Sequence, residues 1–133
     1  MDSVEHSIFC GIDVSKASFD YCIIQSANNQ KLIGMVSNSK FDYDKFIATL
    51  NNYPKERLLI VMESTSIYHL NIYRRLKREQ FHVYVVNPLL IFNFHRSMSL
   101  RKTKTDKKDA YIIALFGMKR QEVLENVFNE LKP

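Results

Sequence analysis

The sequence contains no tryptophan and has only three glycines, three prolines and two cysteines in 133 residues. So little glycine and proline excludes collagen-like and low-complexity chains, while 46% hydrophobic and 25% charged residues are typical of a globular domain. The longest apolar runs, such as 58–62 and 83–86, are too short to cross a bilayer, and residues 1–7 lack the pattern of a signal peptide. We therefore expect one cytoplasmic domain with a full core and no membrane partner.

The two cysteines, Cys10 and Cys22, both fall within predicted strands. A free cysteine in such a place behaves as a small buried hydrophobe. In a cytoplasmic protein the two thiols are expected to stay reduced, without forming a disulfide.

Positive charge is in excess, with 19 lysines and arginines against 14 acids, a net charge of +5 and a pI near 9.2. This excess favours an anionic partner. It is densest in one tract, which contains Arg96, Arg101, Lys102, Lys104, Lys107 and Lys108. The tract is either a solvated loop or a contact to nucleic-acid phosphates, and we expect residues 96–103 to be mobile without nucleic acid.

The pattern of apolar residues predicts a mixed α/β fold. Strands are expected at 8–12, 19–25, 31–37, 57–62 and 81–86, and helices at 40–51, 67–78, 88–94, 105–117 and from 119 onward. Short turns join the first three strands into an antiparallel meander, whereas a helix joins the last two into a right-handed parallel crossover. In the resulting sheet the first strand lies beside the fourth.

Two helices carry expectations about their faces. The helix at 67–78 is expected to be capped by the serines and threonine at 64–66, with Tyr68, Ile72 and Leu76 inward and a basic, solvated outer face. On the helix at 105–117, a second apolar side predicts a self-association surface or a partner domain. That side consists of Ile112, Leu115 and Phe116.

Two buried strands each end in an acid, Asp13 after the run 8–12 and Glu63 after the run 57–62. Because burying an unpaired charge is costly, such an acid usually faces solvent, a cation or a hydrogen-bond donor. In sheets of this kind ligands bind beyond the carboxyl ends of the parallel strands, which is where both acids are expected.

Asp106 and Asp109 are three residues apart and share one helix face. Small or apolar residues continue that face toward the sheet, namely Ala110, Ile113, Ala114 and Gly117. If this helix begins over the strand ends, all four acids converge, and their repulsion requires cations. Mg²⁺ or Mn²⁺ is the natural choice, and two such ions about 3.5 to 4 Å apart would hold the attacking and leaving oxygens of a phosphodiester.

Each of these residues also has a structural explanation. Asp106 caps its helix and Asp109 complements the macrodipole in that case. Glu63 pairs with Arg57 or Lys16 instead of a metal. Lys16 and Lys104 are either partners of phosphate and carboxylate groups or ordinary solvated lysines.

Four motifs in order resemble a known family. They are Gly11-Ile12-Asp13-Val14-Ser15-Lys16, Glu63-Ser64-Thr65-Ser66-Ile67-Tyr68, Val86-Asn87-Pro88 and Lys104-Thr105-Asp106-Lys107-Lys108-Asp109-Ala110. Together they resemble the amino-terminal domain of the DEDD transposases of bacterial insertion sequences, the group that includes the Piv and MooV invertases. The resemblance implies an RNase H-like, RuvC-like fold, with Asp13, Glu63, Asp106 and Asp109 as an acidic tetrad that binds Mg²⁺. It also implies DNA recombination guided by a structured RNA, with a homo-oligomer in the full-length protein.

The sequence departs from the family pattern in two ways. Ser66 stands where the family commonly has glycine. Members also continue into a second domain with a serine thought to be the nucleophile, a region that this sequence lacks. We expect residues 1–118 to form the catalytic domain and 119–133 to begin a helical linker, so that the isolated domain recombines nothing alone.

Two other functions compete with a catalytic domain of a DNA transposase. The first is a non-catalytic nucleic-acid-binding module whose acids are structural. The second is a fragment of an actin-like kinase or ATPase, which also opens with a Gly-Ile-Asp strand. That class needs a glycine in the phosphate hairpin after the strand, and Val14 to Phe19 contains none.

Overall fold

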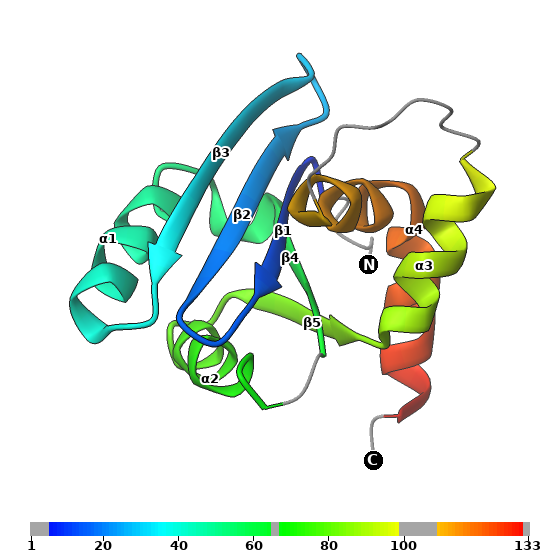
Figure 1. Ribbon diagram of the computed structural model, residues 1–133. Coiled ribbons are helices and arrows are strands. Elements are labelled where there is room, and N and C mark those ends of the chain that lie inside the picture. Colours follow the sequence, from blue (N-terminus) through cyan, green and yellow to red (C-terminus); the bar gives the residue numbers. More distant parts are fainter. Residues whose placement is uncertain (1–5, 65–66, 99–108, 132–133) are drawn as a thin grey trace.

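The computed structural model describes residues 6–64, 67–98 and 109–131 and contains one five-stranded sheet (Figure 1). The strands are β1 (Ile8–Val14), β2 (Ser18–Gln25), β3 (Gln30–Ser37), β4 (Leu58–Glu63) and β5 (His82–Val86), in the order β3-β2-β1-β4-β5. β1 pairs antiparallel with β2, and β2 with β3, whereas β4 runs parallel to both β1 and β5. The predicted mixed sheet of an RNase H-like domain is confirmed, with the first strand beside the fourth.

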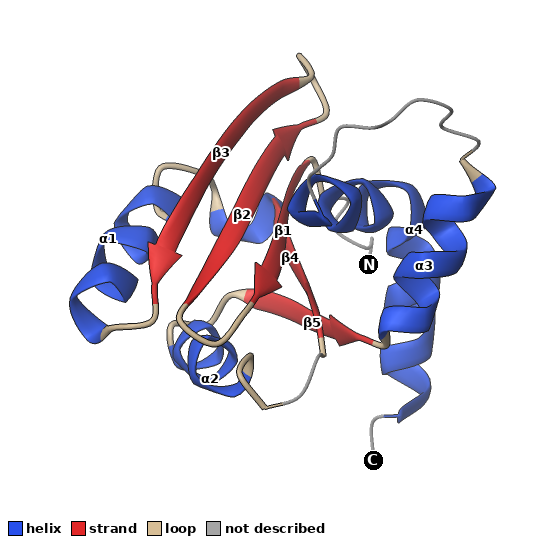
Figure 2. Ribbon diagram, in the orientation of Figure 1, coloured by secondary structure: helices blue, strands red, loops and turns tan. Residues whose placement is uncertain are grey.

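Helices cover both faces of this sheet (Figure 2). They are α1 (Lys40–Leu50), α2 (Leu70–Arg78), α3 (Pro88–Ser97) and α4 (Asp109–Leu131), with a short 3₁₀ turn, η1 (Lys55–Arg57), before β4. α1 and α2 pack on one face, and α3 and α4 on the other. None of the helices in the described part of the chain has the length and apolar content that crossing a membrane requires.

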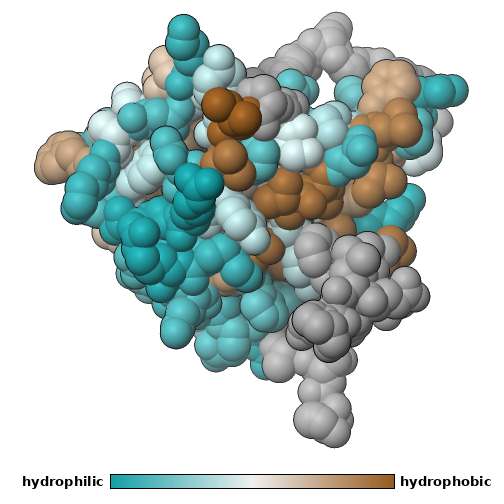
Figure 3. Space-filling model, turned by 90° about the horizontal axis from the view of Figure 1, so that it is seen from below, coloured by the Kyte–Doolittle hydropathy of each residue, from teal (hydrophilic) through white to brown (hydrophobic). Residues whose placement is uncertain are grey.

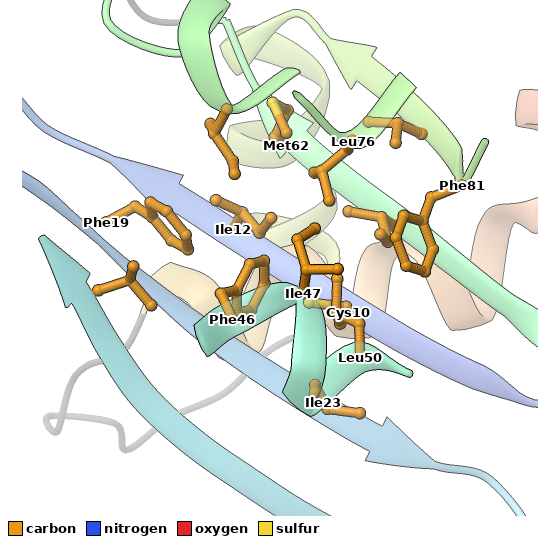
Figure 4. Packing of buried hydrophobic residues seen from close by; sticks show 14 of the residues in the cluster. Cys10, Ile12, Phe19, Ile23, Phe46, Ile47, Leu50, Met62, Leu76 and Phe81 are labelled. Carbon is orange, nitrogen blue, oxygen red and sulfur yellow. The ribbon is translucent and has the colours of Figure 1, made fainter. Parts of the chain in front are cut away.

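The core under α1 forms as the sequence predicts. Ser39 caps the helix, because its hydroxyl accepts a hydrogen bond from the Asp42 amide at 3.3 Å. Phe46 turns inward and meets the Phe19 ring of β2 edge to face, with 5.0 Å between centroids (Figure 4). The expected buried free thiols are also confirmed: Cys10 lies in this core and Cys22 on the opposite face of the sheet.

α2 begins later than predicted, at Leu70 instead of residue 67. The predicted cap is absent at Ser64, because the Ser64 amide and hydroxyl both donate to the Val86 carbonyl, at 3.0 and 3.4 Å. Residues 65 and 66 lie outside the described part of the chain. With no helical turn at residue 68, Tyr68 is 41% exposed, so its predicted inward position is wrong, whereas Ile72 and Leu76 are buried as expected.

α4 combines the two helices predicted at 105–117 and from 119 onward. It runs from Asp109 with a kink at Arg120, whose φ of −124° and ψ of 22° are not helical. The predicted break is therefore present as a kink, while residues 99–108, including the predicted first turn, lie outside the described ranges.

The second apolar side of α4 is not the open surface that the sequence predicts. Ile112, Leu115 and Phe116 are each at most 8% exposed, and the Phe116 ring packs edge to face on Phe94 of α3, 5.5 Å away. α3 therefore covers this side, so the expectation that it is open for self-association or for a partner domain is wrong. A hollow of about 470 Å³ remains between α3, α4 and β5, on the side of the molecule where apolar residues gather in Figure 3.

We predict that Gly11→Ala destabilises the fold where α4 crosses β1. A methyl group at Gly11 would collide with the backbone of α4 at Ala110 and Ala114. Since backbone atoms cannot move aside without shifting the helix, we expect a loss of about 3 kcal/mol in the free energy of unfolding, measured by urea denaturation.

Gly34→Ala is the matched control for this prediction. Its added methyl group would meet the end of the Tyr21 side chain at 2.6 Å, in an edge strand. The Tyr21 ring packs on Phe46, 4.9 Å between centroids, but a side chain can shift where a helix backbone cannot, so the expected loss is smaller, about 1 kcal/mol. Equal losses for the two variants would show that α4 does not press on β1 as described.

Candidate metal and nucleic-acid site

Asp13 and Glu63 lie on the same face of the sheet and at the same end of neighbouring strands. Phe9 of β1 and Val61 of β4 face α4, so side-chain alternation places Asp13 and Glu63 on that side as well. Ile12 pairs with Met62 in the parallel register, and the two acids occupy the next position on each strand. The strand ends therefore bring together two acids that are 50 residues apart in sequence.

Asp109 is the third acid at this end of the sheet. It is the first residue of α4, and the next residue, Ala110, lies directly over Gly11 of β1. The charge of Asp109 acts on both Asp13 and Glu63. Asp106, the fourth predicted member, lies outside the described residues.

Burial and mutual repulsion perturb these acids. Burial raises the pKa of Asp13 from 3.8 to about 6, and the charges of Asp109 and Asp20 add to the effect. Burial also raises the pKa of Glu63, with further contributions from the charges of Asp13 and Asp109. The ion pairs found among the described residues join Asp44 to Lys40 and Arg75, and Arg75 to Glu79, and include none of the three acids.

Asp20 is an acid that sequence reasoning missed. It stands opposite Asp13 in the antiparallel register of β1 and β2, a placement that brings two like charges together and is unfavourable by itself. The pairing depends on where the two strands end. A turn of three residues, 15–17, joins β1 and β2 and sets the register that puts Asp20 across from Asp13. The predicted strands, 8–12 and 19–25, are shorter than β1 and β2, and the first of them leaves Asp13 outside the pairing.

These groups line a hollow of about 240 Å³ at the mouth of the site. Its walls are Asp13, Asp20, Cys22, Ile33, Asp109, Ala110 and Tyr111. The volume is below the ~300–1,000 Å³ of pockets that enclose a drug-sized ligand.

Carboxylate oxygens are the donors that Mg²⁺ and Mn²⁺ prefer, so the chemistry of Asp13, Glu63 and Asp109 fits the expected metal. Within the residues that the structure describes, no three His, Cys, Asp or Glu side chains are grouped closely enough to hold an ion. The acids are thus gathered at one end of the sheet without forming a closed coordination shell.

The structural explanations for these acids fare differently. Arg57 precedes β4 and Glu63 ends it, so six residues of strand, about 20 Å, separate them and a pair between them is wrong. No ion pair joins Glu63 to Lys16 among the described residues. Asp109 does lie in the first turn of α4, where the macrodipole favours an acid whether or not a metal binds.

The predicted basic contacts are described only in part. Lys16 is exposed in the turn after β1, three residues after Asp13. Arg96 is not in a loop as predicted but in the last turn of α3, with its guanidinium 5.7 Å from the Phe92 ring centroid. Arg101, Lys102, Lys104, Lys107 and Lys108 lie outside the described residues, so the predicted mobility of 96–103 stays a prediction there.

Comparison with known proteins points to one family. Residues 10–130 match the family model described as a transposase, of the DEDD type and IS110 group. The chain is 29% identical over 116 residues to the pilin gene-inverting proteins of Moraxella lacunata and Moraxella bovis, which covers 87% of this chain and 36% of each relative. The chain thus spans little more than a third of the length of these relatives.

Two solved structures show weaker likenesses. A Bacteroides thetaiotaomicron protein with an actin-like ATPase fold and unknown function aligns with a TM-score of 0.49 and 16% identity, over 65% of this chain and 35% of its own. Archaeoglobus fulgidus Pelota aligns with a TM-score of 0.44 and 7% identity, over 95% of this chain and 39% of its own.

We predict that Asp13→Asn stabilises the metal-free chain at neutral pH. The folded state raises the pKa of this carboxyl, so ionisation lowers the free energy of unfolding as the pH rises from about 4 to about 6. The shift corresponds to about 3 kcal/mol, which partial exposure reduces to about 1 kcal/mol. Urea denaturation in chelator should show this gain at pH 7 and little difference below pH 4.

Asp44→Asn is the control with the opposite sign. Hydrogen bonding to Arg75 lowers the pKa of Asp44, so its ionised form stabilises the fold and its replacement should bring no gain at neutral pH. If the Asp13→Asn chain is less stable than wild type at pH 7, the claim that the Asp13 charge destabilises the metal-free fold is wrong.

Proposed function

The chain belongs to the DEDD transposase family, and we propose that it is the catalytic domain of a DNA transposase or recombinase that cleaves and transfers phosphodiesters with the help of a divalent metal. The observation that carries this proposal is the meeting of Asp13, Glu63 and Asp109 from β1, β4 and α4. A fold gains nothing from placing these charges together, since the charge of Asp109 makes Asp13 and Glu63 harder to ionise, and Asp13 adds to the effect on Glu63. A cation explains the arrangement.

The residues that would hold the metal are Asp13, Glu63 and Asp109, with Asp106 as the fourth. When bound as two ions, Mg²⁺ or Mn²⁺ would neutralise charge on a phosphoryl group and lower the pKa of a bound water. The protein's own contribution is positional. Two strand ends and one helix start fix the carboxylates from three directions, which keeps them rigid.

The basic residues supply the affinity for DNA in this proposal. They are Lys16, Arg96, Arg101, Lys102, Lys104, Lys107 and Lys108. The tract leads directly into Asp109, so a polyanion held by it would lie next to the acids. A structured guide RNA and a homo-oligomer stay expectations that follow from the family alone.

The domain boundary is also a proposal. We place the catalytic domain at 1–118 and the start of a helical linker at 119–133. The kink at Arg120 supports this division, because it interrupts α4 two residues after the proposed boundary.

A non-catalytic nucleic-acid-binding module is the second candidate. The observation that favours it is that no three metal-binding side chains are grouped closely within the described residues. The catalytic domain should bind a divalent metal and support strand cleavage, whereas the binding module should do neither.

We predict that Asp13→Asn and Asp109→Asn each weaken Mn²⁺ binding to the chain, followed by electron paramagnetic resonance at neutral pH. Loss of a ligand should cost at least the ~10–100-fold that loss of an outer partner of a ligand costs. Glu122→Gln removes the same charge from an exposed position on α4 and should leave binding unchanged. Equal affinities for all three variants would leave only the binding module.

Catalysis can be tested in a chimera in which this chain replaces the matching region of the Moraxella bovis pilin gene-inverting protein. Glu122→Gln should keep the inversion activity of the chimera, and Asp13→Asn should abolish it. Inversion at an undiminished rate with Asp13→Asn would refute the catalytic role.

We also predict that the basic tract determines how DNA binding depends on salt. Replacing Arg101, Lys102 and Lys104 by glutamine should reduce the slope of log affinity against log salt by up to about 0.9 per lost phosphate contact on duplex DNA. The measurement is fluorescence anisotropy with a labelled duplex.

The matched control removes three charges from the exposed face of α2, at Arg74, Lys77 and Arg78. Since these residues are expected to be merely solvated, the salt slope should change little. If both triple variants change the salt slope equally, DNA binding depends on the net charge of the chain and not on the basic tract.

A further inference from the structure

We infer that Lys31, Ile33 and Tyr111 form a seat for an unpaired nucleotide adjacent to the phosphodiester on which the acids act. We call these three residues the β3–α4 seat. The inference rests on the proposed function, because it assumes that a DNA strand reaches the acidic end of the sheet. It adds a residue set that positions the substrate and gives the site a preference for strands with exposed bases.

Two residues of the β3–α4 seat share one hollow with two of the proposed metal-binding acids, and Lys31 lies over the Tyr111 ring. Ile33 and Tyr111 line the same 240 Å³ hollow as Asp13 and Asp109. Ile33 approaches it from the edge strand and Tyr111 from the first turn of α4. A group bound beside Asp13 and Asp109 in this hollow therefore has Ile33 and Tyr111 among its neighbours, together with Asp20 and Cys22.

The seat combines an apolar, an aromatic and a cationic group on one face of the sheet. Ile33 is 60% exposed although it is a large hydrophobe. It pairs with Cys22 across β2 and β3, and Lys31 pairs with Ile24, so alternation puts Lys31 and Ile33 on the face that carries α4. The Lys31 ammonium lies 4.5 Å from the centroid of the Tyr111 ring.

A nucleotide strand fits this combination better than other ligands do. It alternates a charged phosphate, which suits the acids with their metal and the Lys31 ammonium, with a flat base that stacks on aromatic and aliphatic side chains. The hollow has room for one base or sugar, since a drug-sized ligand takes ~300 Å³ or more. In a duplex the base faces are covered by their neighbours, so the occupant is unpaired or extruded.

The absence of tryptophan in the sequence provides a direct test. Tyr111→Trp introduces the sole indole, and a base stacked on it should quench its emission when a short oligothymidylate is added in Mg²⁺. Phe41→Trp is the matched control. Like Tyr111, Phe41 has a lysine ammonium near its ring, that of Lys45 at 5.0 Å, and it is 67% exposed. Phe41 belongs to α1, however, which packs on the other face of the sheet. Its emission should not change.

Affinity measurements separate stacking from charge. Ile33→Ser should weaken binding of the oligothymidylate about fivefold without changing the salt slope. Leu32→Ser, on the same strand but the opposite face and 42% exposed, should bind as wild type. Lys31→Gln should lower the salt slope of single-strand binding by about 0.7. The affinity for a duplex of equal length should be the same in Ile33→Ser and wild type.

The outcomes distinguish this inference from the proposed function. If wild type binds the strand but the Tyr111→Trp emission does not change and Ile33→Ser matches Leu32→Ser, the seat is wrong while the proposed function stands. If Asp13→Asn leaves Mn²⁺ binding intact, the proposed metal site fails independently. If light scattering shows a wild-type dimer that Ile33→Ser dissociates, the edge strand binds a second copy instead and the inference is overturned.

Discussion

The close approach of α4 to β1 at Gly11 is the contact on which the site depends. Because Gly11 has no side chain, the α4 backbone at Ala110 and Ala114 lies directly on the strand. This contact fixes the start of the helix, and Asp109 is the residue just before it. A larger residue at position 11 would move Asp109 away from Asp13, so a packing requirement inside the core sets the geometry of the acids outside it.

The two faces of the sheet have different roles as a result. The face under α1 and α2 is a closed apolar core built on Phe19, Phe46 and Leu50 (Figure 4). The face under α4 is closed along its length but opens where β1 and β4 end, and there the side chains change from Phe9 and Val61 to Asp13 and Glu63. The first face supplies stability, and the open end of the second has charges that reduce it.

Elements whose cause is local could be predicted from the sequence. Ser39 caps α1 by accepting a hydrogen bond from the amide of Asp42, three residues on. Unbroken apolar runs produce β1 and β4, so the acids at the ends of these strands were placed correctly. The errors arose where a distant partner decides the outcome. Val86 binds Ser64 and delays α2, and Phe94 covers Phe116 on α4. Neither partner can be identified from the pattern of one helix alone. Asp20 was missed because β1 is longer than predicted, and Asp13, with which Asp20 pairs, is one of the added residues.

Among the described residues no ion pair includes Asp13, Asp20 or Asp109, and their charge also determines what kind of ligand can stay at this end of the sheet. A neutral apolar ligand would bury Asp13 further and raise its ionisation cost, while an anion alone would be repelled by Asp13, Asp20 and Asp109. Only a cation, or an anion that arrives with one, lowers the free energy of this end of the sheet. A phosphodiester bound together with a divalent metal meets that condition, and the same charges that weaken the empty fold then favour the loaded one.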